Sequence, residues 1–335
     1  MDQQYTHRLE KIESVLERWL PLNPGPDWGR EVFPGITPQL LQALVSPGKD
    51  LLSRGGKRWR PLLMTLVCEA LGGGDAALPL VPLVEFCHNA SLIHDDIEDN
   101  SDERRGKPAV HIIHGVDVAI NSGSFLYFLP LACIDSWAAD PYCKLKIYSL
   151  WAAYLRKLHL GQAMDIHWHR NFEAIPSLDE YFTMCKLKTG CLARFAAELG
   201  AVVAEMNSTI SVPIESLYAA AEKLGVGFQI LDDVKNVTTG IPGKKRGDDI
   251  VEGKKSLPVL LFLNRQPEKM EMVFRCFNAA RSGGVGVPEV EELIQALAAA
   301  GVFAEAEAQA KTLVAEAREA FAGFALLGGL VDIIV

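Results

Sequence analysis

The chain has 335 residues, 49% of them hydrophobic and 22% charged, which is the composition of an ordinary soluble globular protein. Its formal net charge of −9 argues against a general nucleic-acid-binding protein, because the surface of such a protein should be basic. The seven cysteines follow no metal-binding or redox spacing, so we expect reduced core residues of a cytoplasmic protein.

The first residues are polar and the segment after them is amphipathic, so no targeting signal is expected. No run approaches the roughly 18 to 20 apolar residues that a membrane span requires, and no stable membrane insertion is expected. Apolar residues recur at helical spacing, for example at Ile12 and Leu16 near the start and at Val290, Leu293 and Leu297 near the end. Alternating strand patterns are nearly absent, which predicts an all-α protein.

Roughly ten or more helices are predicted, separated where glycine and proline cluster. The breaks are expected at 21–26, 53–56, 72–74, 240–253 and 283–288. Four helices are expected to be central because they are apolar on most faces. They span about 80–99, 116–137, 142–167 and 217–237. The run 257–263 could pass for a buried strand, but helix is favoured in this context.

Two acidic motifs lie in long apolar stretches, where residues 95–99 read Asp-Asp-Ile-Glu-Asp and residues 232–236 read Asp-Asp-Val-Lys-Asn. We call them the first and the second aspartate motif. A carboxylate withdrawn from water is costly unless a cation compensates it. On a helix, positions i and i+4 lie on one face with i+1 alongside. Magnesium ions that carry a diphosphate are therefore the expected partners.

Basic segments that contain glycine accompany the aspartate motifs at 55–61, 104–106, 188–190 and 243–256. Taken singly, an acidic helix end or a basic loop is more often a solvated face. Their combination favours two bound polyanions, at least one of them held through metal. The pairs His111 and His114, and His167 and His169, have no supporting cysteine or carboxylate set, so no zinc site is expected.

These segments together resemble the trans-isoprenyl diphosphate synthases of the polyprenyl synthetase family. The motifs that match lie at 55–61, 91–100, 104–106, 161–165 (Gly-Gln-Ala-Met-Asp), 188–190, 228–233 and 253–258. The resemblance implies a single all-α domain over 1–335, a helical bundle of the isoprenoid synthase type with a central deep apolar cavity. It also implies a homodimer that condenses isopentenyl diphosphate with an allylic diphosphate, such as dimethylallyl, geranyl or farnesyl diphosphate, and that uses magnesium.

The resemblance further implies roles for individual residues. Magnesium would be bound by Asp95, Asp96, Asp99, Asp232, Asp233 and Asn236. Catalysis would depend on Asp95, Asp96, Lys188, Asp232 and Asp233. Isopentenyl diphosphate would lie against Lys57, Arg60, His88 and Arg105, without metal. The allylic diphosphate would contact Arg104, Lys188, Thr189, Gln229, Lys244 and Lys254.

Two positions depart from the family pattern. Asn236 stands where many members have a third aspartate, which removes one charge but keeps an oxygen ligand, as in the geranylgeranyl-producing members of eukaryotic type. Ser124 follows Gly123 where many bacterial members carry an aspartate, and the sequence attaches no firm consequence to it.

Product length should depend on the residues one or two helical turns from Asp95. Ala90 and Ser91 are small, so the cavity should run past them, whereas an aromatic residue is common there in fifteen-carbon producers. The residues expected to form the floor of the cavity are Phe125, Tyr127 and Phe128. These aromatics could equally be plain core, but a floor at this depth predicts a twenty-carbon main product, geranylgeranyl diphosphate.

Three other functions remain open. A farnesyl or longer-chain polyprenyl diphosphate synthase would share all the motifs. A terpene cyclase would need no second phosphate pocket. The cations at 57, 60 and 105 indicate such a pocket and therefore argue against a cyclase. A non-catalytic regulatory subunit of a heteromeric synthase would usually lose one of the aspartate motifs, and both are present here.

Overall fold

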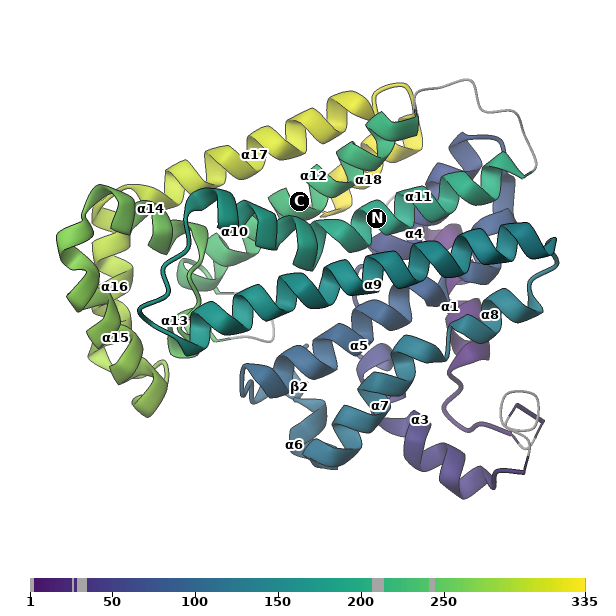
Figure 1. Cartoon of the computed structure of the whole chain (residues 1–335), viewed down its shortest axis with the longest axis horizontal. Coiled ribbons are helices and arrows are strands. Elements are labelled where there is room, and N and C mark those ends of the chain that lie inside the picture. The colour runs from purple at the N-terminus through teal and green to yellow at the C-terminus, as the bar shows by residue number, and fades with distance from the viewer. Residues whose placement is uncertain (1–2, 26, 29–34, 207–213, 241–244, 335) are drawn as a thin grey trace. The chain divides into compact units, whose positions relative to one another are not determined.

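The computed structural model describes residues 3–25, 27–28, 35–206, 214–240 and 245–334, and these residues are predominantly helical (Figure 1). The strands among them are β1 (Glu103–Arg104) and β2 (Lys107–Pro108), which pair in an antiparallel hairpin. The prediction of an all-α fold is therefore confirmed. The chain divides into two compact units, which are described separately below; a single domain over 1–335 remains a prediction.

Unit 1 comprises Met1–Ala153, Phe195–Tyr218 and Phe324–Ile334. Its helices are α1 (Gln3–Trp19), α3 (Pro38–Ser53), α4 (Trp59–Ala70), η1 (Gly74–Leu80), α5 (Pro82–Glu98), α6 (Val110–His114), α7 (Val116–Phe128), α8 (Leu131–Ser136) and α18 (Ala325–Ile334), with parts of α9 (Pro141–Arg170), α11 (Cys191–Glu205) and α12 (Ile214–Val237). Helix α4 is buried from Trp59 to Cys68 and forms the centre of this unit. Helix α5 packs against α7.

A glycine sets the distance between α4 and α11. A Cβ at Gly200 would overlap the carbonyl oxygen of Met64 on α4 and would lie 3.2 Å from the nitrogen of Cys68. The two backbones therefore approach more closely than any other residue at position 200 allows. Gly328 in α18 is the opposite case, because a Cβ there would meet no heavy atom within 4 Å.

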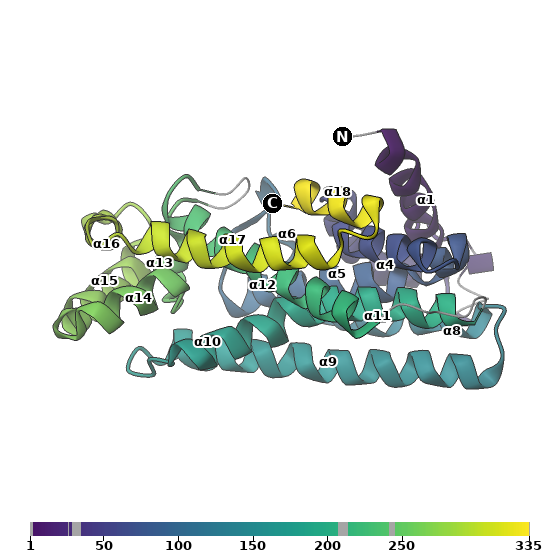
Figure 2. The same ribbon diagram turned by 90° about the horizontal axis from the view of Figure 1, so that it is seen from above.

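Unit 2 comprises Tyr154–Arg194 and Ala219–Gly323, with Val335. Besides the remaining parts of α9, α11 and α12, its elements are α10 (Leu178–Cys185), the π-helix η2 (Lys186–Gly190), α13 (Asp248–Glu252), α14 (Leu257–Arg265), η3 (Pro267–Lys269), α15 (Met270–Gly283), α16 (Pro288–Ala299) and α17 (Val302–Ala320). Figure 2 shows α9 as one long uninterrupted helix. Helix α14 is buried from Leu257 to Leu263, so the continuous apolar run at 257–263 belongs to a core helix and not to a strand.

The four predicted central helices are present, with one correction. The helix predicted over 116–137 is two helices, because α7 ends at Phe128 and α8 begins at Leu131. Pro130 explains the break, since its nitrogen cannot donate a helical hydrogen bond and its ring clashes with the carbonyl four residues earlier in a continuous helix. The helix predicted over 80–99 begins at Pro82, a residue suited to the first helical position.

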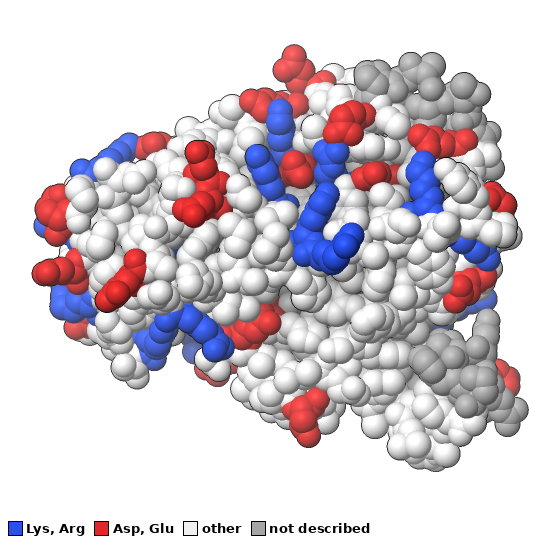
Figure 3. Space-filling model, viewed as in Figure 1, with Lys and Arg blue, Asp and Glu red and all other residues white. Residues whose placement is uncertain are grey.

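Two segments, Gly74–Glu98 and Val116–Ser136, are long and apolar enough to cross a membrane by length and composition. The sequence expectation that no segment approaches this length is therefore too strict. Core helices of globular proteins meet the same criterion, and 67% and 50% of the most apolar windows of these segments are buried. On the face drawn in Figure 3, basic and acidic side chains are interspersed over a largely uncharged surface.

Candidate active site

The first aspartate motif closes helix α5. Asp95 and Asp96 lie in its last turn, and Asp99 follows as the C-terminal cap, whose N–H donates to the carbonyl of Asp95. The next residue, Asn100, has a left-handed backbone (φ 54°), which ends the helix. Asp96 is fully buried and Asp99 is 8% exposed. Two carboxylates are thus withdrawn from water at one helix end, where a compensating cation is required.

Arg104 supplies that cation in unit 1. Its Nε donates to Asp96 Oδ1 at 2.7 Å, one terminal nitrogen forms an ion pair with the same oxygen, and that nitrogen lies 3.5 Å from Asp95 Oδ2. The hairpin of β1 and β2 brings Arg104 back over the end of α5. The sequence assigned Arg104 to a diphosphate, and the structure places it on the first aspartate motif, where any diphosphate held by these aspartates would meet it.

A second group of cations in unit 1 lies around His88. Arg60 Nη1 lies 3.3 Å from His88 Nε2, and both Arg60 and Arg105 lower the pKa of the imidazole. Burial lowers this pKa most, so His88 is neutral and accepts a hydrogen bond from Arg60. Three of the four predicted isopentenyl diphosphate ligands therefore lie together. The fourth, Lys57, donates to the carbonyl of Ile334 at 2.8 Å.

Arg105 is held by backbone oxygens of the last turn of α3 and of the loop that follows it. It donates to Leu51 O at 3.2 Å, to the Gly55 carbonyl and to Asn89 Oδ1 at 3.5 Å. Its backbone is left-handed (φ 54°), and burial lowers its pKa to about 10. A Cβ at Gly56 would lie 3.2 Å from the Arg105 guanidinium, so glycine is needed where the loop passes this side chain.

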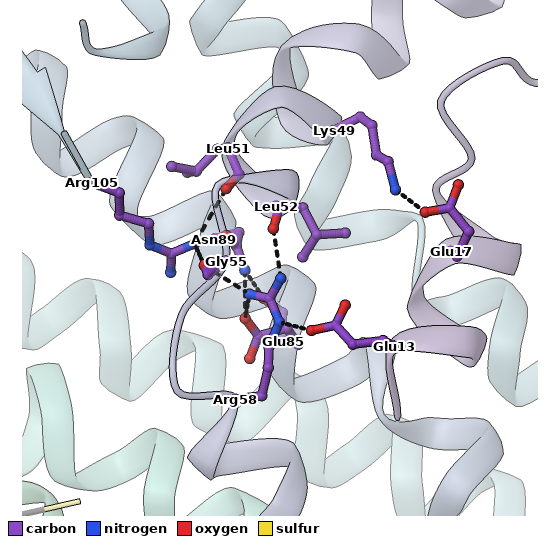
Figure 4. A network of polar contacts seen from close by, with 10 residues as sticks. All are labelled: Glu13, Glu17, Lys49, Leu51, Leu52, Gly55, Arg58, Glu85, Asn89 and Arg105. Atoms are coloured by element: carbon purple, nitrogen blue, oxygen red, sulfur yellow. Dashed lines mark hydrogen bonds and ion pairs between the residues drawn. The ribbon is translucent and has the colours of Figure 1, made fainter. Parts of the chain in front are cut away.

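Arg58, one of the three cations in the basic segment 55–61, is paired with carboxylates. Figure 4 shows its guanidinium between Glu13 and Glu85, to which it donates at 2.7 and 2.8 Å. It is 5% exposed and also donates to the carbonyl of Leu52. Asn89 donates to the same Glu85 oxygen at 2.9 Å. Arg58 is therefore a buried structural cation.

The second aspartate motif lies in the last two turns of α12 in unit 2. Asp233 is 7% exposed and accepts from Tyr181 Oη at 2.7 Å and from Gln229 Nε2 at 2.8 Å. Burial raises the pKa of the Asp233 carboxyl to about 6, against these two hydrogen bonds, which lower it. Thr189 donates to Gln229 Oε1 at 2.7 Å, so a chain of three polar side chains orients this carboxylate.

Asn236 is the last residue of the second aspartate motif and carries an amide where a third aspartate would carry a carboxylate. It is 1% exposed, and its Oδ1 accepts from the backbone N–H of Asp249 at 3.2 Å. The amide oxygen therefore fixes the start of α13 on the motif and has one lone pair left for a metal ion. An aspartate at this position could accept the same bond, but it would add a buried charge.

Each predicted cation of unit 2 that the structure describes is paired with a carboxylate. Lys188 Nζ lies 2.5 Å from Asp165 Oδ2, and Lys254 Nζ lies 2.6 Å from Glu252 Oε2. Lys188 belongs to the π-helix η2, and a Cβ at Gly161 would lie 2.5 Å from the Lys188 nitrogen. Gly161 thus lets α9 approach the turn that presents Lys188. Lys244 lies outside the described residues.

The buried Lys255 and the exposed Arg281 anchor the segment that carries Lys254. Lys255 Nζ donates to the carbonyls of Trp168 and Gly253 at 2.7 and 3.1 Å, and Arg281 donates to those of His169 and Glu252 at 2.6 and 2.9 Å. These bonds fix the segment to the C-terminal end of α9, where carbonyls lack helical partners. The Lys255 ammonium also lies over the ring of Phe172, 5.0 Å from its centroid.

Sequence reasoning missed the partners of these site residues. Asp165 was visible as the last residue of the motif at 161–165, and Glu252 as an acid two residues before Lys254. Tyr181 is an ordinary aromatic in an amphipathic helix, and its contact with Asp233 spans 52 residues of chain. Only the first two left a signal in the sequence.

The predicted chain-length residues differ in burial. Ala90 is fully buried and Ser91 is half-buried, with its hydroxyl donating to the carbonyl of His88. Tyr127 is 8% exposed and Phe125 is half-buried. Phe128 is 61% exposed, so its ring does not lie inside the core of this chain.

The donor set of both motifs suits magnesium, which prefers carboxylate and amide oxygens. Within the described residues, no three His, Cys, Asp or Glu side chains form a ready-made metal cluster. Magnesium in such sites is held by one or two carboxylates together with substrate phosphates, not by a cage of protein ligands. The burial of Asp96 and Asp233, each stabilised by a donor, fits carboxylates kept ready for such an ion.

A family model described as Polyprenyl synthetase matches residues 41–296 of this chain. The chain belongs to the polyprenyl synthetase family. The resemblance deduced from the motifs is thereby confirmed, and with it the prediction of a prenyl-transferring enzyme.

A geranylgeranyl pyrophosphate synthase of Neocamarosporium betae is 36% identical over 235 residues, which are 69% of this chain and 65% of that protein. The match thus spans slightly less than two thirds of this relative's length. Geranylgeranyl pyrophosphate synthetase from Pyrococcus horikoshii Ot3 has a similar structure, with a TM-score of 0.79 at 27% identity and 99% of each chain covered. A polyprenyl synthase from Caulobacter crescentus CB15, solved with calcium and isoprenyl diphosphate, gives a TM-score of 0.79 at 25% identity over 98% of this chain and 95% of that one.

Proposed function

We propose that this protein condenses isopentenyl diphosphate with an allylic diphosphate in a magnesium-dependent chain elongation, with geranylgeranyl diphosphate as the main product. The observation that carries the proposal is the group of Arg60, His88 and Arg105, which lie together in unit 1. Two guanidinium groups beside a neutral imidazole suit a second diphosphate that binds without metal. A single-substrate terpene cyclase has no use for such a pocket.

The allylic diphosphate is assigned to the aspartate motifs and their cations. Magnesium would be held by Asp95, Asp96, Asp99, Asp232, Asp233 and Asn236. It would supply positive charge to the oxygens of the departing diphosphate. Direct contacts are assigned to Arg104, Lys188, Thr189, Gln229, Lys244 and Lys254. The pairing of Lys188 with Asp165 and of Lys254 with Glu252 supports this, because a paired lysine is already oriented before the ligand arrives.

Breaking the allylic C–O bond leaves a carbocation and a diphosphate, so the chemical task is to stabilise charge on the leaving group. Two unit charges about 4 Å apart interact by roughly 4 kcal/mol at an effective dielectric of 20. Arg104, Lys188 and Lys254 together can thus contribute a large part of the ~8 kcal/mol that marks the low end of enzymatic acceleration. The double bond of isopentenyl diphosphate then attacks the cation, and the departing diphosphate takes the proton that is lost.

Product length is assigned to α5 and α7 of unit 1. Ala90 is buried and Ser91 is half-buried, and both side chains are too small to block a cavity beside α5. Tyr127, which is buried on α7, is the residue to which we assign the limit, with Phe125 beside it in the sequence. Phe128 is a weaker candidate because its ring is mostly exposed. The relatives named geranylgeranyl synthases support a twenty-carbon product.

We further propose a homodimer in the cytoplasm, as the family resemblance implies. Sedimentation velocity of the purified protein checks the first point. A single species near 73 kDa, about twice the 36.7 kDa of the chain, is expected. A species near the monomer mass at micromolar concentration would contradict the dimer.

The decisive experiment is incubation of the purified protein with magnesium, isopentenyl diphosphate and each allylic diphosphate in turn, followed by sizing of the products. Twenty-carbon products are expected, and a chelator should abolish them. Asp95→Asn and Asp232→Asn should each lower turnover by roughly 10²- to 10³-fold, the effect of removing one charge-stabilising group. Asp179→Asn, an exposed aspartate in the first turn of α10, is the matched control and should retain activity.

The competing functions predict other outcomes. Cyclic products from a single allylic diphosphate would identify a terpene cyclase. Elongation to chiefly fifteen carbons, or to thirty and more, would contradict the product assignment but not the reaction. Absence of elongation with every allylic partner would refute the proposal and leave the regulatory subunit.

A further inference from the structure

His94, the residue before the first aspartate motif, is fixed between α5 and α7 in unit 1. Its Nδ1 lies 2.9 Å from the carbonyl oxygen of Ala90, and its Nε2 lies 3.3 Å from Ser124 Oγ on α7. A carbonyl only accepts, so Nδ1 carries the proton. In the neutral ring, Nε2 then accepts from the Ser124 hydroxyl. The two bonds fix both the position of the ring and its rotation.

The fixed imidazole lies against Tyr127. The two ring centroids are 5.6 Å apart and the planes differ by 18°, which is a stacked arrangement. Ser124 and Tyr127 are three residues apart and therefore lie on the same face of α7. A Cβ at Gly123 would lie 2.8 Å from His94 Cε1. Helix α7 thus has no side chain at the position where one would push the imidazole away.

The contacts of the His94 imidazole in the described part of unit 1 are with Ala90, Ser124 and Tyr127, and these contacts join α5 to α7. We propose that His94 is a positioning residue that holds the Tyr127 ring in place and thereby sets the length of the product. The inference rests on the proposed function and adds a residue to it. Ser124, the departure from the bacterial pattern to which the sequence attached no consequence, acts here as the donor that orients His94.

The test is the product distribution of variants under the elongation assay. His94→Ala removes the stack, so Tyr127 can rotate aside, and the share of products longer than twenty carbons should rise at least threefold. His94→Phe keeps a ring against Tyr127 and should largely retain the wild-type distribution. Ser124→Ala leaves the imidazole in place without its Nε2 partner and should shift the distribution in the same direction, but less.

The double variant separates positioning from a direct effect of size. If His94 acts through Tyr127, His94→Ala combined with Tyr127→Ala should give the distribution of Tyr127→Ala alone. Products longer than those of Tyr127→Ala would overturn the inference, because His94 would then bound the cavity itself. Unchanged lengths in both His94→Ala and Ser124→Ala would overturn it as well.

A matched control exists in α9. His159 Nδ1 lies 2.9 Å from the carbonyl of Leu155, four residues earlier, as His94 Nδ1 does from Ala90, but His159 is exposed. His159→Ala should leave product lengths unchanged, and a shift there equal to that of His94→Ala would overturn the inference. If the wild type elongates and the variants leave the product lengths unchanged, this inference alone is refuted. Wild-type protein that does not elongate refutes the proposed function and this inference with it.

Discussion

Arg104 compensates a carboxylate that has no access to water. Asp96 is fully buried, and the guanidinium of Arg104 forms an ion pair with it. Lys188 and Lys254 are placed in the same way against Asp165 and Glu252. At the scale of single residues, three cations assigned to the diphosphate, Arg104, Lys188 and Lys254, are thus paired with carboxylates of the protein. Their charges are held in place before substrate binds.

Arg104→Ala should therefore destabilise the metal-free protein more than an exposed arginine would. Removing one partner of a buried pair typically costs about 3–5 kcal/mol, because the other charge remains buried. Magnesium can replace the lost charge, so it should raise the melting temperature of Arg104→Ala more than that of the wild type. Thermal unfolding with and without magnesium measures both effects.

The control for this prediction is Arg275→Ala, which removes an exposed arginine paired with Glu292. Its stability should change by less than about 1 kcal/mol and its response to magnesium should equal that of the wild type. An equal magnesium response in Arg104→Ala and the wild type would contradict the assignment of the first aspartate motif to metal.

At this scale the sequence indicated candidate site residues but not most of their partners. The aspartates and basic segments are recognised because their spacing is local, within a helical turn or a short loop. The basic segment 55–61 did not reveal that Arg58 is a structural cation, because its partners Glu13 and Glu85 lie 45 and 27 residues away and no local pattern indicates them. Its ion pairs with Glu13 and Glu85 mark Arg58 as a structural cation, whereas burial does not, because Arg58 and Arg60 are 5% and 7% exposed.

Among the elements, the contact of α11 with α4 depends on one missing side chain. Gly200→Ala should destabilise unit 1 by roughly 1–3 kcal/mol, because a Cβ there overlaps a backbone carbonyl that cannot move aside without shifting α4. Gly328→Ala in α18 is the matched control. It meets open space and should stabilise the protein by up to about 1 kcal/mol. Urea unfolding of both variants checks the opposite signs, and a stabilised Gly200→Ala would refute the packing argument.

Lys255, which binds the end of α9, should make the unfolding free energy of the protein depend on pH. Burial, and then the neighbouring Arg281, lowers the pKa of Lys255 to about 7, whereas a lysine in the unfolded chain has a pKa of about 10.4. Between these values the unfolded chain holds a proton that the folded chain has released. The wild type should therefore gain stability from this group as the pH rises, by about 1.4 kcal/mol per pH unit.

Lys255→Met lacks this group. The unfolding free energy of the wild type minus that of Lys255→Met should increase by about 2 kcal/mol from pH 7.5 to pH 9.0. Urea denaturation at the two pH values measures it. Lys311→Met, in which an exposed lysine is replaced, should show no such change. Parallel pH dependence of the wild type and Lys255→Met would show that Lys255 titrates in the folded protein as an ordinary lysine.

The sequence predicted some secondary-structure elements and missed others. Helix was recognised throughout because apolar residues recur at helical spacing, and the break at Pro130 was visible in the sequence although the prediction ran through it. The π-helix Lys186–Gly190 could not be foreseen, because side-chain patterns do not distinguish one wide turn from an α-helical one. Such turns are frequent at functional sites, and this one carries Lys188 and Thr189.

For the whole molecule, the assignment of both aspartate motifs to one ligand has a thermodynamic test. A ligand at 100 times its dissociation constant stabilises the folded state by about 2.7 kcal/mol, or roughly 4 °C for a chain of this size. Magnesium with inorganic diphosphate should produce such a shift in the wild type, and neither Asp95→Asn nor Asp232→Asn should show it. A full shift of the melting temperature in Asp232→Asn would show that the second aspartate motif does not take part in binding this ligand.

The division of the chain into two units had no counterpart in the sequence. Helices α9, α11 and α12 contribute residues to both, so no linker, change of composition or proline-rich stretch marks a boundary. The family motifs fall in both units, with residues 91–100 in one and 228–233 in the other. Sequence spacing could therefore identify the motifs but not the compact unit to which each belongs.

The left-handed backbone of Arg105 has a consequence for how this protein would respond to selection. A side chain at φ 54° costs stability that glycine would not, and the Arg105 charge is buried at a further cost. Screening random variants for heat resistance alone should favour glycine or asparagine at position 105. Screening for turnover should retain arginine, so the two screens would diverge at this residue.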